Sequence, residues 1–167
     1  MADEHTAGAL AAEPYRLARR ETLHLVGLEA EVTVATAPVA IAALWRRFLT
    51  LPVAIPHAIN QPPVGFCTLQ CEIGSFLYAC ALQVTEPYEP PEGLVLHTVP
   101  PAEYAVFRHA GPVTSISETY ARIFAGDLVP GRTLATPGTI LELFLPKFDP
   151  ATGEGGVEIW IALEADG

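Results

Sequence analysis

The sequence predicts an α+β domain made of two similar halves, each with a strand, a helix and two further strands in an antiparallel sheet, and a ligand cleft between the halves. Three observations predict this arrangement. Two segments, near residues 38–50 and 112–125, carry apolar side chains at three- and four-residue spacing, which is typical of one main helix per half. Segments of strand-like composition flank each helix in the same order. A proline-rich stretch, residues 87–91, separates the two series.

The first half begins with an expected strand over residues 20–34, in which Gly27 indicates a bulge or a close approach of neighbouring backbone. The following helix begins near Pro38, and Trp45 lies on its apolar stripe, so we expect Trp45 to be a core residue. A loop with four prolines covers residues 52–63. The pattern then predicts two strands, at residues 64–71 and 76–84.

The second half repeats this order. We expect a long strand over residues 94–108 that Pro100 and Pro101 break in the middle, a helix over 113–124, and closing strands at 139–145 and 157–163. Residues 1–17 are expected to form a disordered tail. One domain then covers residues 18–165, with halves at about 18–86 and 93–165.

Charge and cysteine content exclude several classes of function. Nine basic and 19 acidic residues give a net charge of −10, which argues against nucleic-acid binding because phosphate contacts need clustered Lys and Arg. We find no signal-peptide pattern and no apolar run of membrane-spanning length, and therefore expect a cytoplasmic protein. Cys67, Cys71 and Cys80 lie in apolar segments and lack metal-ligand spacing, so we expect small buried hydrophobic residues, with no metal and no cofactor.

Two carboxylates interrupt the closing strands. Alternation places Glu158 and Trp160 on the face opposite to Val157, Ile159 and Ile161, whose composition indicates a helix-covered core. On the neighbouring strand Glu142 and Phe144 share a face. If the strands form a hairpin, we expect both carboxylates and both aromatic rings on one wall of the cleft. Alternation is equally compatible with an open sheet on which both glutamates face solvent.

A carboxylate among aromatic rings has a definite chemical use. Burial raises its pKa unless a cation pairs with it, and a cationic ligand can supply that charge. Trp160, Phe144, Tyr78 and Tyr104 are the rings that can add cation–π contacts. Aromatic residues in strands also serve as plain packing residues, and the pattern does not separate the two roles.

Three motifs resemble a known family. They are Pro-Ala-Glu-Tyr-Ala-Val-Phe-Arg-His-Ala-Gly-Pro at residues 101–112, Glu-Thr-Tyr at 118–120 with Ile123, and Val-Glu-Ile-Trp-Ile at 157–161. Together they resemble the GyrI-like family, the effector-binding domain of AraC-type and MerR-type transcription activators. The resemblance covers about Arg20 to Glu164 and implies the SHS2-like duplicated βαββ fold. The sequence departs from the family pattern at Ala81, Ala102 and Ala162.

The resemblance also implies a function. It implies a cleft that takes a hydrophobic, cationic or aromatic small molecule, with a buried glutamate at its base that the motif match identifies as Glu158. We therefore expect a stand-alone sensor or sequestering protein, with no direct nucleic-acid or membrane contact and with a separate transcription regulator as partner. The alternative is a hydrolase of cyclopropane-bearing alkylating compounds with Glu158 as its catalytic residue. A third interpretation is a protein-interaction domain with an empty groove.

Overall fold

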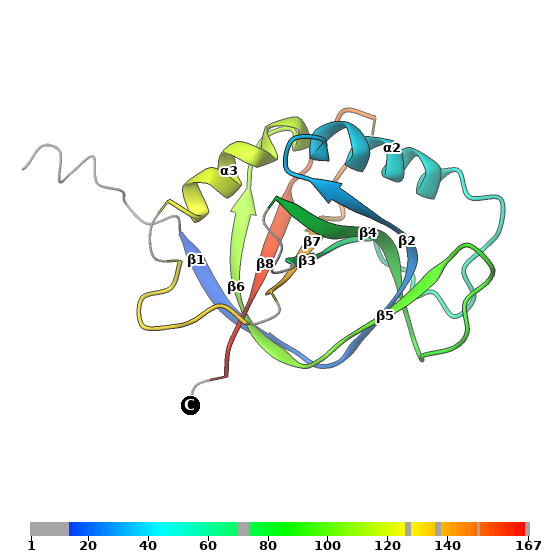
Figure 1. Ribbon diagram of the computed structural model, residues 1–167, viewed down its shortest axis with the longest axis horizontal. Helices are drawn as coiled ribbons and strands as arrows, with labels where there is room; N and C mark the ends of the chain where they lie inside the picture. Colours follow the sequence, from blue (N-terminus) through cyan, green and yellow to red (C-terminus); the bar gives the residue numbers. More distant parts are fainter. Residues whose placement is uncertain (1–13, 70–73, 126–127, 136–137, 150, 166–167) are drawn as a thin grey trace, which may run out of the picture.

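The computed structural model describes residues 14–69, 74–125, 128–135, 138–149 and 151–165. Within these ranges, eight strands form one sheet in the order β1-β6-β8-β7-β3-β4-β2-β5, and every neighbouring pair is antiparallel. Two α-helices, α2 and α3, lie together on one side of this sheet (Figure 1). The predicted α+β class is confirmed. Neither helix is long and apolar enough to span a bilayer.

The two halves have the same order of elements. The first contains β2 (Leu23–Thr33), α2 (Ala37–Leu49), β3 (Val64–Leu69) and β4 (Ser75–Val84). The second contains β6 (Ala102–His109), a 3-10 turn (Val113–Ser115), α3 (Ile116–Ile123), β7 (Gly138–Phe144) and β8 (Val157–Leu163). The spatial order β6-β8-β7 mirrors β2-β4-β3, and the halves meet where β7 pairs with β3. The duplicated βαββ plan is thus visible in the sheet itself.

Two further strands are exchanged between the halves. β1 (Tyr15–Arg20) precedes β2 in the chain but pairs with β6, and β5 (Val95–Val99) precedes β6 but pairs with β2. The prediction of a disordered tail over residues 1–17 is wrong at its C-terminal boundary, because Tyr15 already pairs with Phe107. Because β1 is rich in arginine, its hydrophobic pattern did not indicate a strand. Residues 1–13 lie outside the described residues, as does Cys71.

The two helices bury one stripe each. α2 carries a proline in its first turn and buries Leu44 and Phe48 against the sheet. The helix predicted from residue 113 begins at Ile116, because Pro112 is extended and Ser115 closes a tight turn onto the Pro112 carbonyl. α3 is accordingly short, and it buries Thr119 and Ile123.

Both faces of the sheet are buried. The face under the helices carries one core, which includes Val26, Cys80, Phe107 and Ile159. The opposite face carries a second core, which includes Leu25, Phe66, Tyr104, Leu141 and Trp160. Figure 1 shows why: the sheet curves away from the helices, and the connections from β1 to β2 and from β5 to β6 cross on its far side. We call this second face the concave face.

Gly27 allows two strands to approach closely. An added Cβ at this position would lie 1.8 Å from the carbonyl oxygen of Cys80 on β4. The pairing of β2 with β4 continues without interruption from His24 to Thr33. Of the two predicted alternatives, the close approach is therefore the correct one.

Candidate functional site

Glu142 is the buried acid of the helix-covered face. Its residue is only 7% exposed, and it sits in the middle of β7 between leucines. The Tyr78 hydroxyl, from β4, donates a hydrogen bond of 2.7 Å to Oε1 of Glu142. The Tyr120 hydroxyl, from α3, donates one of 2.7 Å to Oε2. Each carboxylate oxygen thus has a tyrosine donor, and the two donors come from different halves of the domain.

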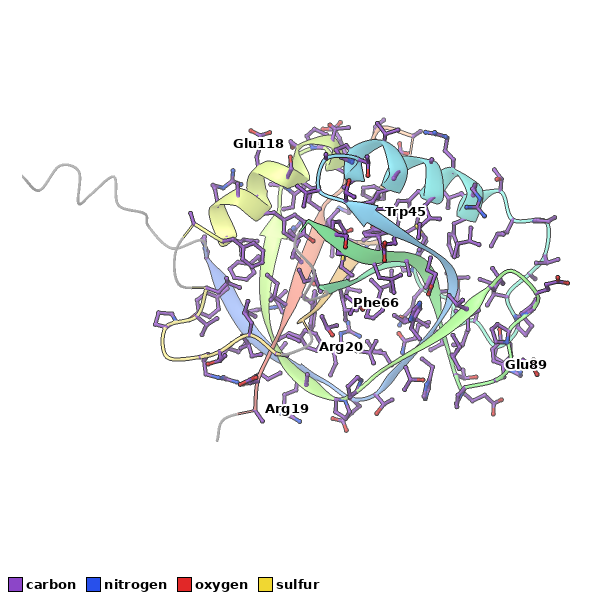
Figure 2. The ribbon with its side chains drawn as sticks, viewed as in Figure 1. Arg19, Arg20, Trp45, Phe66, Glu89 and Glu118 are labelled. Atoms are coloured by element: carbon purple, nitrogen blue, oxygen red, sulfur yellow. The ribbon has the colours of Figure 1, made fainter. Side chains whose placement is uncertain are left out.

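Trp45 extends this network to α2. Its indole Nε1 donates a hydrogen bond of 3.1 Å to the Tyr78 hydroxyl, which in turn donates to Glu142. The Trp45 ring also meets Phe144 edge-on, with the ring centroids 5.1 Å apart. Figure 2 shows the side chain of Trp45 directed from α2 towards the sheet. Trp45 is a packing residue, as predicted, and it also holds the hydroxyl that contacts the acid.

Gly65 makes room for the contact between Glu142 and Tyr78. It lies directly opposite Glu142 in the pairing of β3 with β7. A Cβ at this position would lie 2.5 Å from the Tyr78 hydroxyl oxygen and 2.9 Å from Oε1 of Glu142. The acid and its donor therefore occupy the space that a side chain at residue 65 would fill.

The electrostatics of this cluster come mainly from burial. Burial raises the pKa of Glu142, while the hydrogen bonds from Tyr120 and Tyr78, and to a smaller extent His109, act in the opposite direction. Burial and the adjacent carboxyl group also hold the pKa of Tyr78 and of Tyr120 well above the ordinary value, so both hydroxyls remain donors. Among the described residues, no ion pair links Glu142 to a cationic side chain.

Glu158 lies on the concave face and already has a cationic partner. Nη2 of Arg16, on β1, is 3.2 Å from Oε2 of Glu158. The indole Nε1 of Trp160 donates a hydrogen bond of 3.1 Å to the other oxygen, Oε1. The guanidinium of Arg20 lies over the Trp160 ring, 4.4 Å from its centroid. Tyr104 meets the same ring at a centroid distance of 5.7 Å.

The expectation that both glutamates line one wall is wrong. β7 and β8 do form the predicted hairpin, but Glu142 is opposite Ile159, and Glu158 is opposite Leu143. Because side chains alternate, this one-residue offset puts the two acids on opposite faces of the sheet. The six predicted site residues separate accordingly. The helix-covered face has Glu142, Phe144 and Tyr78; the concave face has Glu158, Trp160 and Tyr104.

A pocket of about 160 Å³ opens on the concave face beside Glu158. Both halves contribute to its wall, through β2 to β4 of the first half and through β7 and β8 of the second. Its lining residues are Arg20, Leu23, Leu25, Gln61, Pro62, Pro63, Val64, Gln83, Leu143, Phe144, Leu145 and Glu158. No group of three or more His, Cys, Asp or Glu side chains among the described residues is placed to hold a metal ion.

Sequence reasoning missed Trp45 and Tyr120 as members of the acid cluster. Trp45 was assigned to the apolar stripe of its helix and Tyr120 appeared within the motif at residues 118–120, and both side chains face the sheet. A signal was available, since a buried Trp N–H or Tyr O–H needs an acceptor. The acceptor itself could not be chosen without knowing which glutamate faces the helices.

The comparison with known families decides the family. The model of the GyrI-like small-molecule-binding domain matches residues 13–164 of this chain. The chain belongs to the GyrI-like family. This GyrI-like domain is also 30% identical, over 152 residues, to the transcriptional regulator BrlR of Pseudomonas aeruginosa. The match covers 89% of this chain and 54% of BrlR, so the chain spans about half the length of that relative.

Solved structures share the fold of this GyrI-like domain. SAV2435 bound to tetraphenylphosphonium superposes with a TM-score of 0.70 at 20% identity, over 91% of this chain and 94% of that one. EcmrR in its complex with DNA superposes with a TM-score of 0.65 at 12% identity, over 96% of this chain and 61% of that one. At these identities the likeness establishes the fold alone.

Proposed function

We propose that this GyrI-like domain binds lipophilic organic cations at Glu142, between α2 and α3. The observation that carries the proposal is a buried carboxylate with two tyrosine donors and, among the described residues, no cationic side chain to pair with. An ionised carboxylate in such a place is costly unless a positive charge comes to it. A ligand that brings this charge removes the cost.

The surroundings of Glu142 suit a delocalised charge. Trp45, Phe144 and Tyr120 supply ring faces and edges around the acid, and cation–π contacts contribute about 0.5–2 kcal/mol each. A bulky cation with a delocalised charge loses little hydration when it leaves water, unlike an ammonium group. SAV2435, which shares this fold, is bound to tetraphenylphosphonium, a cation of this kind.

Access to Glu142 requires side chains to move. The residue is 7% exposed, and its two oxygens are covered by Tyr120 on α3 and by Tyr78 on β4, which Trp45 on α2 contacts in turn. A ligand that reaches the carboxylate must displace at least one of these contacts. Binding is therefore coupled to the position of a helix, which is the property that a sensor needs.

Glu158 fits the role of ligand carboxylate less well than the motif match implies. Its charge is already balanced by Arg16, and Trp160 occupies its other oxygen. A cationic ligand would have to compete with the Arg16 guanidinium. The geometry therefore favours Glu142 as the acid at the base of the ligand site.

The wider role follows from the ligand. We propose that the domain senses or sequesters such cations without touching nucleic acid, because its net charge of −10 repels phosphate. A separate transcription regulator would then carry the response. For hydrolysis of cyclopropane-bearing compounds, Glu158 would have to activate a water, yet Arg16 and the indole N–H of Trp160 already contact its two oxygens.

Calorimetric titration with tetraphenylphosphonium tests the proposal. Glu142→Gln should weaken binding by about 2–5 kcal/mol, because the cation loses a desolvated charge partner. Glu158→Gln is the matched control and should bind as the wild type does. Triphenylphosphine oxide, which is neutral, should bind much more weakly than the cation. Equal affinities in the wild type and Glu142→Gln would refute the proposal. Mass spectrometry of a cyclopropane-bearing compound after incubation would detect turnover.

A further inference from the structure

We propose that the pocket on the concave face is a second ligand site, which takes a small apolar carboxylate through Arg20 and Tyr104. This site does not depend on the proposed cation site: the two share only Phe144, and the other residues that line the pocket are not part of the Glu142 cluster. The pocket has apolar walls, including Leu23, Leu25 and Leu143, and Arg20 is among the residues that line it. It thus combines an apolar interior with two charged side chains, Arg20 and the Glu158 carboxylate that is paired with Arg16.

In the described part of the chain, two buried polar atoms lack partners: one belongs to Arg20, which lines the pocket, and the other to Tyr104, which meets the same Trp160 ring as Arg20 does. Nε of Arg20 and the hydroxyl of Tyr104 are inaccessible to solvent and have no hydrogen-bond partner among the described residues. Tyr104 is 0% exposed. Buried donors are normally paired, because an unpaired buried donor destabilises the folded protein. An acceptor supplied by a ligand would satisfy both.

The two donors lie on the same side of the sheet. Tyr104 is opposite Ala18 in the pairing of β1 with β6, so its side chain shares a face with Arg16 and Arg20. Burial lowers the pKa of Arg20 and raises that of Tyr104, and each group influences the other. Figure 2 shows Arg20 inside the curve of the sheet and its neighbour Arg19 outside it. The side chain of Arg20 therefore lies on the concave face.

The charges of Arg16, Arg20 and Glu158 together favour an anionic ligand. Arg16 is paired with Glu158, which leaves the charge of Arg20 in excess within a molecule whose net charge is −10. A guanidinium binds a carboxylate through two parallel hydrogen bonds, and its Nε–H is one of the donors that such a pair uses. The Arg20 guanidinium also stacks over the Trp160 ring, 4.4 Å from its centroid.

The volume selects the size of the ligand. The pocket measures about 160 Å³, and an engineered apolar cavity of about 150 Å³ accommodates benzene. One aromatic ring or a short branched chain therefore fits, with its carboxylate directed to Arg20. Benzoate has both parts and serves as the probe.

The two tryptophans allow the two sites to be observed separately. The indole N–H of Trp160 donates to Glu158 on the concave face, and that of Trp45 donates to Tyr78 under the helices. In ¹⁵N NMR spectra of the full chain, benzoate should shift the Trp160 indole signal in a saturable manner and shift that of Trp45 much less, because Trp45 meets the pocket only through Phe144. Benzamide, which is neutral, should bind at least about tenfold more weakly. If tetraphenylphosphonium fails to bind at Glu142, the benzoate result still stands.

Matched variants test the donors. Arg20→Gln should weaken benzoate binding at least about tenfold, whereas Arg19→Gln, with the same change in net charge, should not. Tyr104→Phe removes only the hydroxyl and should also weaken binding. An unshifted Trp45 signal confirms that each variant is folded, and if Arg20→Gln does not fold, Tyr104→Phe and the benzamide comparison decide. No saturable shift of Trp160, equal losses in Arg19→Gln and Arg20→Gln, or unchanged binding in Tyr104→Phe would overturn the proposal.

Discussion

Glu142 and Glu158 lie on paired strands, one residue out of register, and therefore on opposite faces of the same sheet. Glu142 is surrounded by aromatic hydroxyls under the helices, and Glu158 is neutralised by Arg16 on the concave face. The two acids are close in space, but one has a cationic partner and the other has only neutral hydrogen-bond donors. Of the two, only Glu142 lacks, within the ranges that the structure describes, a cationic side chain that balances its charge.

Gly65→Ala should damage the acid cluster directly. The new methyl would lie 2.5 Å from the Tyr78 hydroxyl oxygen, which is held by both Trp45 and Glu142. We expect a loss of about 1–3 kcal/mol in the free energy of unfolding, measured by urea denaturation, and weaker binding of tetraphenylphosphonium. Gly93→Ala is the control: it has open space but a φ of +89°, and should cost about 1 kcal/mol without changing binding.

Stability should depend on pH through Glu142. Its raised pKa means that the folded protein retains a proton at pH values where the unfolded chain, with a glutamate pKa of about 4.3, has lost it. Stability from this group is therefore intact below that pH and declines as pH rises towards the folded-state pKa. The slope cannot exceed about 1.4 kcal/mol per pH unit, because one proton is involved. The free energy of unfolding should be measured by denaturation of the wild type and Glu142→Gln across pH. The other titrating groups affect both proteins equally, so the difference between the two curves should show the decline due to Glu142.

Cation binding should follow the opposite trend with pH. The ionised form of Glu142 attracts tetraphenylphosphonium, so affinity should increase as pH rises through the raised pKa and then level off. Calorimetry in buffers of different ionisation enthalpy should detect release of a proton on binding within that range. Glu142→Gln should show a flat profile. A wild-type affinity that falls with rising pH would contradict this assignment.

The fluorescence response to cations should come from one tryptophan. The chain has two, and only Trp45 is connected to Glu142 through Tyr78. We expect tetraphenylphosphonium to change the emission of the wild type and of Trp160→Phe, and to leave that of Trp45→Phe almost unchanged. Trp45→Phe keeps most of the ring packing and loses one hydrogen bond, which should cost about 1 kcal/mol of stability. The reverse pattern would locate the cation on the concave face.

Much of the fold could be predicted from local patterns. The stripe that includes Leu44 and Phe48 identified α2, and the alternation at Val157, Ile159 and Ile161 correctly identified the core face of β8. The sequence of β1 is mostly charged and polar, so local composition could not reveal a strand whose partner, β6, lies about 90 residues away.

The site was harder to predict than the fold. The pattern identified Glu142, Phe144 and Tyr78 as residues of interest, but it could not establish the register of β7 against β8. One residue of offset decides which acid faces Trp45 and Tyr120. Arg16 fell within the expected disordered tail of residues 1–17, so the neutralisation of Glu158 could not be anticipated.

The exchange of β1 and β5 makes each half dependent on the other. A chain cut in the loop between β4 and β5 would yield two pieces joined by three strand pairings: β1 with β6, β3 with β7, and β5 with β2. Each piece alone would expose sheet edges that the other normally covers. The domain is therefore suited to be a split reporter. Each fragment would be fused to one of two interacting proteins, and the continuous sheet would re-form only when those proteins bind each other.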